Sequence, residues 1–210
     1  MRSALSVILV LASAAVTHAE SSSASLTWWQ KVTASPGHHA FTDLALFKGN
    51  YYLCFRSGTN HASLDGIITV LRSPDMRTWQ PAATLDTLGD DRDPHLASAG
   101  DRLFVFFGVW DTRHGEGTRR PERHTVRSHM ASTEDGTTWS DVKGLYEPGW
   151  WLWRVNRIGD AFYTAAYTAR RPVPEFRETR LLRSEDGVNW DLVSTVTRDP
   201  NGATACNNGQ

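Results

Sequence analysis

The sequence has few of the features by which a protein's function is usually identified. Only two of its 210 residues are cysteines, and its formal net charge is −1. Two cysteines do not make a disulfide framework, and a nearly neutral chain lacks the basic excess of a nucleic-acid-binding protein. Glycine-rich phosphate loops, nucleophile elbows and zinc-protease helix motifs are absent, and the histidines lack metal-ligand spacing. We therefore expect no metal, no cofactor and no nucleic-acid partner.

Long apolar runs are also absent, apart from one at the N-terminus. Arg2 precedes a run of mostly apolar residues from Ala4 to Val16, and small residues follow before Glu20. This pattern is typical of a secretory signal peptide cleaved after Ala19, and the run is too short to remain as a membrane-spanning helix. We predict a signal peptide over 1–19 and a secreted or periplasmic mature chain without a membrane anchor.

The two cysteines, Cys54 and Cys206, leave two interpretations open. An exported protein meets the oxidising conditions in which such a pair forms a disulfide. Alternatively, both are buried free thiols, or their partners lie in sequence beyond this chain.

The sequence does contain a repeat. Three segments, near 40–88, 89–147 and 148–198, each hold four short apolar or alternating runs separated by turn residues. This is the pattern of four successive antiparallel strands, which we call A to D. The A–B turns contain glycine beside Asn or Asp, at Gly49, Gly100 and Gly159, and glycine suits the positive φ of a tight hairpin.

The C–D turns share the pattern Ser/Thr-x-Asp-(Gly)-x-x-Trp. Its three copies, hereafter the Asp turns, are Ser73–Trp79, Thr133–Trp139 and Ser184–Trp190. We expect each hydroxyl and carboxylate to bond the amides of its own turn, and each tryptophan to fill the space beside the neighbouring sheet. These aspartates are therefore predicted to be structural. Met76 replaces the glycine in the first copy, so that turn should be either the most strained or the most altered in conformation.

Repeated four-stranded units of this kind form β-propellers. We predict an all-β chain in which residues 20–210 form a partial propeller of about three blades in an incomplete ring. Residues 199–210 continue the spacing of the repeat and are predicted to begin a fourth blade. Three such units do not close a ring, so the natural protein is expected to be longer.

The strand order also predicts which residues share a side. The starts of strands A and the B–C loops lie at the end of the sheets opposite the Asp turns. Among the B–C loops, the one around 111–123 is longest, and loops that vary on a repeated scaffold often carry function. Polar and aromatic residues predicted at this end are Asp43, Arg56, His61, Asp65, Arg92, Asp93, Trp153 and Arg154.

Such a group suits an anionic or polyhydroxylated ligand. Guanidinium groups bind carboxylates or hydroxyls, carboxylates transfer protons, and aromatic rings stack on sugars. The alternative is that Arg56 pairs with Asp43 or Asp93 only to neutralise buried charge.

Several phrases of the sequence are similar to those of one protein family. The segments AFTDLALFKGNYYLCFRSG, GIITVLRSPDMRTW, DDRDPHL, WWLWRV and SEDGVNW resemble exported bacterial proteins of the sialidase superfamily, which carry BNR or Asp-box repeats. The resemblance implies a six-bladed propeller with a glycan site opposite the Asp boxes. It also implies three arginines for the substrate carboxylate, an acid/base aspartate in an early loop, and a tyrosine nucleophile beyond this chain. Asp65 lies in such a loop, whereas Thr42, Asp43 and Leu44 stand where the family has Arg-Ile-Pro.

Our hypothesis is an exported, sialidase-like glycoside hydrolase that acts on terminal sugars of glycans, with the present chain inactive by itself. Predicted substrate-binding residues are Arg56, His61, Arg92, Trp153 and Arg154. Predicted acid/base residues are Asp43, Asp65 and Asp93. The alternative is a non-catalytic propeller that binds glycans or proteins.

Overall fold

The structure is a computed structural model that describes residues 25–111, 125–168 and 177–199. The chain divides into two units, 1–31 and 32–210, and every strand belongs to the second. In the first unit, the described residues 25–31 are exposed and have no regular secondary structure. The predicted signal peptide, most of the 111–123 loop, the predicted start of a fourth blade and Cys206 lie outside the described residues.

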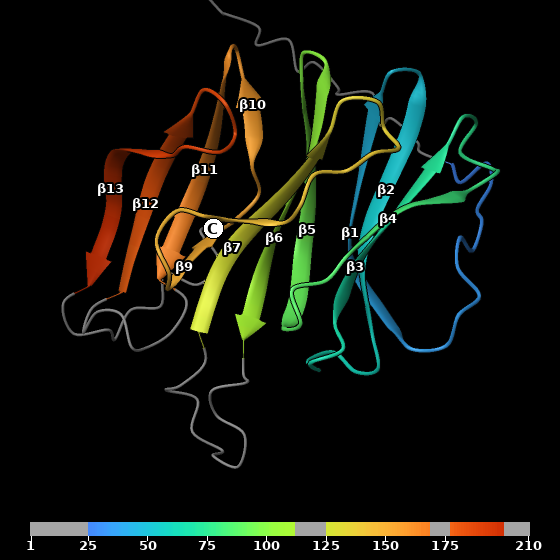
Figure 1. Cartoon of the computed structure of the whole chain (residues 1–210), viewed down its shortest axis with the longest axis horizontal. Helices are drawn as coiled ribbons and strands as arrows, with labels where there is room; N and C mark the ends of the chain where they lie inside the picture. Colours follow the sequence, from blue (N-terminus) through green and yellow to red (C-terminus); the bar gives the residue numbers. More distant parts are fainter. Residues whose placement is uncertain (1–24, 112–124, 169–176, 200–210) are drawn as a thin grey trace, which may run out of the picture. The chain divides into compact units, whose positions relative to one another are not determined.

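Three antiparallel sheets make up the second unit (Figure 1). The first contains β1 (His38–Phe47), β2 (Asn50–Gly58), β3 (Ile67–Ser73) and β4 (Gln80–Leu85). The second contains β5 (Asp90–Ala99), β6 (Arg102–Asp111), β7 (Thr125–Thr133) and β8 (Lys143–Leu145). The third contains β9 (Trp150–Leu152), β10 (Asn156–Ile158), β11 (Ala161–Thr168), β12 (Arg177–Ser184) and β13 (Asp191–Asp199).

The chain passes through each sheet as a meander, so that strands adjacent in sequence pair with one another. In the third sheet, β9 and β10 both pair with β11, and together they occupy the place of strand A. The described residues contain no helix, and therefore none that could cross a membrane. The predicted all-β fold of four-stranded antiparallel units is confirmed.

Two apolar clusters hold the sheets face to face, with the second sheet between the other two. Successive side chains of a strand point to opposite faces. In β6, Leu103 and Val105 therefore pack against the first sheet, whereas Phe104 and Phe106 pack against the third. Cys54 lies in the first cluster as a fully buried free thiol, and this burial raises its pKa.

All three Asp turns have the predicted hydrogen bonds. In each, one carboxylate oxygen of Asp75, Asp135 or Asp186 accepts two backbone N–H groups at 2.7–2.8 Å and also accepts the Ser or Thr hydroxyl. These bonds lower the pKa of Asp75 to about 2. The aspartates are thus committed to their own turns.

The tryptophans of the Asp turns are less uniform than predicted. Trp190 is buried in the cluster between the second and third sheets, and the half-buried Trp139 packs against the cluster between the first and second. Trp79 is also half-buried, and its Nε1 donates to the carbonyl of Met76 at 3.2 Å.

Met76 adopts the left-handed conformation expected of a glycine. Its φ is 58°, close to the 77° of Gly136 and the 76° of Gly187 at the same place in the other turns. A residue with a Cβ is strained in this region, and the strain amounts to about 1 kcal/mol or slightly more. The predicted strain in the first turn is therefore present.

Replacing Met76 by glycine should relieve this strain. We expect Met76→Gly to raise the free energy of unfolding of the full chain by about 1 kcal/mol in urea titrations. Gly136→Ala should lower it by more than that, because the added Cβ would collide with Oη of Tyr52. A loss of stability in Met76→Gly would contradict this account of the turn.

Candidate functional site

Strand A of every sheet carries one extra residue at the same level. The four residues 40–43 of β1 pair with three residues of β2, and the four residues 92–95 of β5 pair with three residues of β6. In the third sheet, the five residues 152–156, which join β9 to β10, lie opposite four residues of β11. Such bulges bend a strand and re-aim its side chains. They turn side chains of three sheets toward a common region, which we call the bulge site. Its members are Asp43, His61, Arg92, Asp93, His95, Trp153, Arg154 and Tyr167.

Two of the bulges contain a residue with left-handed backbone. Phe41 has φ 59° and Asp93 has φ 51°, at matching positions of β1 and β5. This conformation is uncommon outside glycine, although aspartate tolerates it better than most residues. Its recurrence indicates that the bulge imposes it, and strained residues of this kind concentrate at functional sites.

The carboxylate of Asp43 connects all three sheets. Its Oδ2 accepts the backbone N–H of Leu96 at 3.0 Å and lies 3.7 Å from His95 Nδ1, both in the second sheet. Its Oδ1 accepts Nη2 of Arg154, at the third sheet, at 3.3 Å. Burial alone would raise the pKa of Asp43, but His95, the Leu96 amide and Arg154 together hold it below its usual value. Asp43 is therefore a fixed negative charge.

A second carboxylate fixes the loop that follows β2. Arg56 is fully buried, and its Nε donates to Asp90 Oδ1 at 2.8 Å. The rest of its guanidinium donates to the carbonyls of Asn60 at 2.8 Å and Ser63 at 3.3 Å. Asp90 also lies 3.6 Å from Nη1 of Arg92. Arg56 is thus enclosed by protein groups and has no surface left for a ligand.

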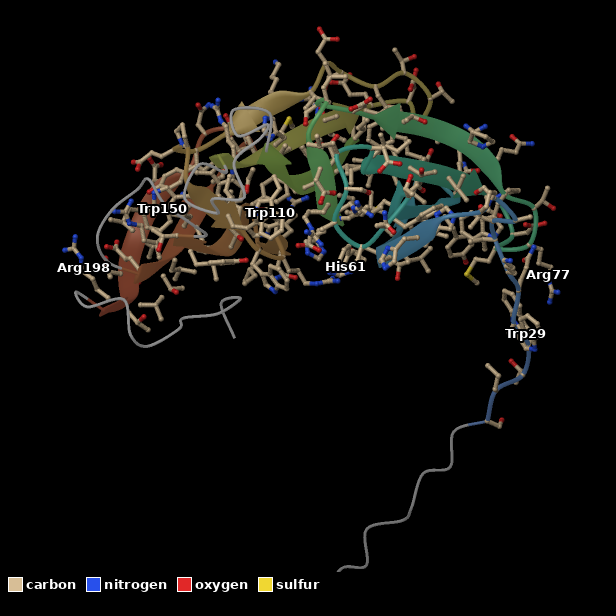
Figure 2. The ribbon with its side chains drawn as sticks, turned by 90° about the horizontal axis from the view of Figure 1, so that it is seen from below. Trp29, His61, Arg77, Trp110, Trp150 and Arg198 are labelled. Atoms are coloured by element: carbon tan, nitrogen blue, oxygen red, sulfur yellow. The ribbon has the colours of Figure 1, made fainter. Side chains whose placement is uncertain are left out.

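Arg92 joins this pair to the aromatic side chains of the bulge site. Its guanidinium lies over the rings of Phe41 and Trp110, 5.2 and 4.9 Å from their centres, in the geometry of cation–π contacts. Its Nη2 donates to the carbonyl of His61 at 3.2 Å. Figure 2 accordingly shows His61 and Trp110 near each other. Arg92 is buried, so it organises the surrounding residues more than it presents charge to solvent.

Asp93 differs from the other carboxylates of this group. Within the described part of the chain, no hydrogen bond or ion pair holds it. Burial raises its pKa, and the charges of Arg92, His95 and His61 offset only part of that effect. The phenol of Tyr167 is close enough that burial and the charge of Asp93 both raise its pKa. Asp93 is the carboxyl of the bulge site that is free to gain or lose a proton.

An aromatic wall stands beside these carboxylates. The ring centre of Trp153 lies 6.0 Å from that of His95 and 6.4 Å from that of Tyr167. Both ring nitrogens of His95 are buried, and neither is within hydrogen-bond distance of a described residue, since Nδ1 lies 3.7 Å from the carboxylate of Asp43. Buried polar atoms without a partner are rare, so His95 is suited to a water or ligand hydroxyl as its missing partner.

The structure does not bring Asp65 to this group. Its side chain is exposed, and its Oδ2 accepts the backbone N–H of Thr59 at 2.9 Å and the Thr59 hydroxyl. It lines a separate open cavity of about 700 Å³ with residues that include His39 and Thr69. The bonds from Ser63 and Thr59 lower its pKa, so it is a poor proton donor at neutral pH.

The predicted residues therefore fall into three groups. His61, Arg92, Asp43, Asp93, Trp153 and Arg154 come together, Arg56 touches them only through Asp90, and Asp65 lies apart. Sequence reasoning did not single out Asp90, His95 or Phe41 as partners in this site. The polar run DDRDPH at the start of β5 was the available signal, because such a run is unusual at the start of a buried strand.

Three solved structures similar to this chain indicate its fold. A protein of unknown function from Dyadobacter fermentans has a TM-score of 0.58 and 19% identity, over 77% of this chain and 56% of that chain. A GH32 β-fructofuranosidase from Bombyx mori has a TM-score of 0.55 and 15% identity, over 77% and 36%. A sialidase from Trypanosoma rangeli has a TM-score of 0.56 and 13% identity, over 78% and 31%.

These likenesses support the propeller-like fold. No model of a protein family matches the chain, and no curated protein matches it. The chain spans between 31% and 56% of the length of the three structures.

Asp91, beside the bulge site, should make stability depend on pH. It is fully buried, its oxygens accept the N–H and hydroxyl of Thr87 at 2.8 and 2.5 Å, and burial raises its pKa to about 7. An unfolded aspartate has a pKa of about 4, so the folded state binds the extra proton between about pH 4 and 7. The stabilisation that the folded state gains from binding this proton is fully present below about pH 4 and is lost as the pH rises to about 7.

Asp91→Asn should remove this dependence. Relative to the unmodified chain, its free energy of unfolding should rise between pH 4 and 7 by up to about 1.4 kcal/mol per pH unit, as measured by urea titrations. Asp101→Asn, which alters an exposed A–B turn, should show no such rise. A difference between Asp91→Asn and the unmodified chain that stays constant with pH would refute the assignment.

Proposed function

We propose that this chain is part of a glycan-acting propeller, and that the bulge site contributes to binding a terminal sugar and cleaving its glycosidic bond. The observation that carries the proposal is the position of one uncommitted carboxyl, Asp93, close to the aromatic wall of Trp153 and Tyr167. The fold is similar to those of a sialidase and a β-fructofuranosidase, which supports a glycosidase and leaves the sugar open.

Asp93 is suited to the role of general acid. A glycosidic oxygen must gain a proton as its bond breaks, and a raised pKa favours the protonated form of a carboxyl that donates it. The half-buried position of Asp93 shifts its pKa in this direction, whereas Asp43 is held ionised by its three partners. The two carboxyls therefore differ in role because their surroundings differ.

The other members of the site are suited to binding. Trp153 offers an aromatic surface for the apolar face of a sugar ring. Arg154, whose side chain is 49% exposed, is the arginine of the group with most surface for a hydroxyl of the ligand. The other two arginines hold the loop after β2 in place. Arg92 bonds the carbonyl of His61. Arg56 bonds the carbonyls of Asn60 and Ser63.

A second candidate function is non-catalytic glycan binding. Most glycoside hydrolases use a pair of carboxyl groups, one as acid and the other as base or nucleophile. In the described residues of the bulge site, Asp93 is uncommitted while Asp43 and Asp90 are paired with arginines. This imbalance favours a binding protein unless the second carboxyl comes from outside the described residues. For either function, the N-terminal segment supports export as the route to an external glycan.

Asp93→Asn distinguishes the two functions. If the natural full-length protein hydrolyses a member of a panel of aryl glycosides, we expect this substitution to lower kcat at least about 100-fold, with KM changed far less. The asparagine keeps the size of the side chain and removes the proton, so binding should persist. Asp101→Asn, on an exposed turn at the other end of the sheet, serves as the matched control.

Three results would decide between the candidates. Hydrolysis that falls in Asp93→Asn but not in Asp101→Asn supports the enzyme. Glycan binding without hydrolysis of any aryl glycoside supports the binding protein. Hydrolysis that is unchanged in Asp93→Asn contradicts the role of Asp93 as the acid.

A further inference from the structure

The arginines of the bulge site and its neighbours already contact carboxylates of the protein. Arg56 pairs with Asp90, which Arg92 also approaches at 3.6 Å, and Arg154 pairs with Asp43. The side chains of Arg56 and Arg92 are 0% and 7% exposed, so neither guanidinium presents an open face to a ligand. Within the described residues, each arginine of the group already has a carboxylate partner.

A further carboxyl of the bulge site, Asp93, adds no positive charge to the group. Asp93 has no cationic partner in direct contact among the described residues. An acidic sugar bound beside Trp153 would bring its carboxylate toward Asp43, which is held ionised. Two carboxylates in a partly buried site repel each other, and the buried Arg56 and Arg92 have no open face with which to offset that repulsion.

The surroundings instead match the chemistry of an uncharged sugar. The indole of Trp153 and the phenol of Tyr167 provide apolar surface with a polar edge. His95, whose Nε2 has no hydrogen-bond partner among the described residues, and the uncommitted Asp93 provide groups that exchange hydrogen bonds with hydroxyls. These aromatic surfaces and hydrogen-bonding groups can bind a sugar that carries no formal charge.

We infer that the bulge site takes a neutral sugar and discriminates against acidic sugars, because Asp43 already occupies Arg154. This inference rests on the proposed function, since it names the class of sugar that the same site binds. It makes Asp43 the residue that sets the charge preference, because its carboxylate already offsets the charge of Arg154 before a carboxylated ligand binds.

Binding to matched pairs of glycans tests the inference. The natural full-length protein is titrated with lactose and 3′-sialyllactose, and with methyl glucoside and methyl glucuronide, by calorimetry or tryptophan fluorescence. We expect the neutral member of a pair to bind at least about tenfold more tightly, with an affinity that changes less than twofold between 50 and 500 mM NaCl. This comparison needs no variant.

Asp43→Asn provides the sharper test. The amide keeps an oxygen for the Leu96 N–H, but it removes the negative charge beside Arg154. The affinity for the acidic member should therefore rise at least about tenfold relative to the neutral member. Asp43→Asn combined with Arg154→Gln should lose this gain, and Asp101→Asn, which changes the net charge equally, should show none.

The outcomes separate the inference from the proposed function. Tighter binding of the acidic sugars by the unmodified protein, or no gain of acidic binding in a folded Asp43→Asn, overturns the inference while leaving a glycan site. If Asp43→Asn does not fold, the comparison of neutral and acidic sugars on the unmodified protein decides. Failure of broad panels of both neutral and acidic glycans to bind overturns the proposed function and the inference with it.

Discussion

The carboxylate of Asp43 is the contact on which the arrangement of the bulge site depends. One side chain of the first sheet bonds a backbone amide of the second and an arginine at the third, so three sheets share one negative charge. Apolar packing between the sheets tolerates small sliding, whereas a carboxylate held by an amide and a guanidinium fixes direction and distance. The aligned bulges make this contact possible, because they place Asp43, His95 and Arg154 at one level.

This arrangement separates the roles of two carboxyl groups that look equivalent in sequence. Asp43 is ionised and occupied, and its charge is used to join sheets. Asp93 occupies the neighbouring bulge, where burial favours its protonated form and no described residue bonds it. Environments that push two carboxyls in opposite directions are typical of acid–base sites. Arg56, which is paired with Asp90, also bonds two carbonyls of the loop that carries His61 and thereby holds that loop in place.

The parts of the structure that could be predicted from the sequence are those set by local chemistry. The turn glycines and the Ser/Thr-x-Asp turns indicated where strands pair, and the resulting meander put the starts of strands A at one end. The bulges could not be predicted, because a slip of one residue depends on the partner strand as well as on the strand itself. For the same reason the sequence did not separate the buried Arg56 from the half-exposed Arg154.

Asp65 illustrates a different limit. Its position in an early loop fitted an acid/base role, but the conformation of that loop turns its carboxylate toward Thr59 and an outer cavity. A loop conformation follows from many weak contacts, including those that Arg56 makes with Asn60 and Ser63, and none of these is visible in residue spacing.

The opposite behaviour of the two carboxyls is open to direct measurement. Carbon-13 NMR titration of the aspartate carboxyl groups reports each pKa without any ligand, with assignment by Asp43→Asn and Asp93→Asn. The account predicts that Asp43 titrates below the usual aspartate range and Asp93 above it. A pKa for Asp93 in or below the usual range, or one for Asp43 above that of Asp93, would contradict it.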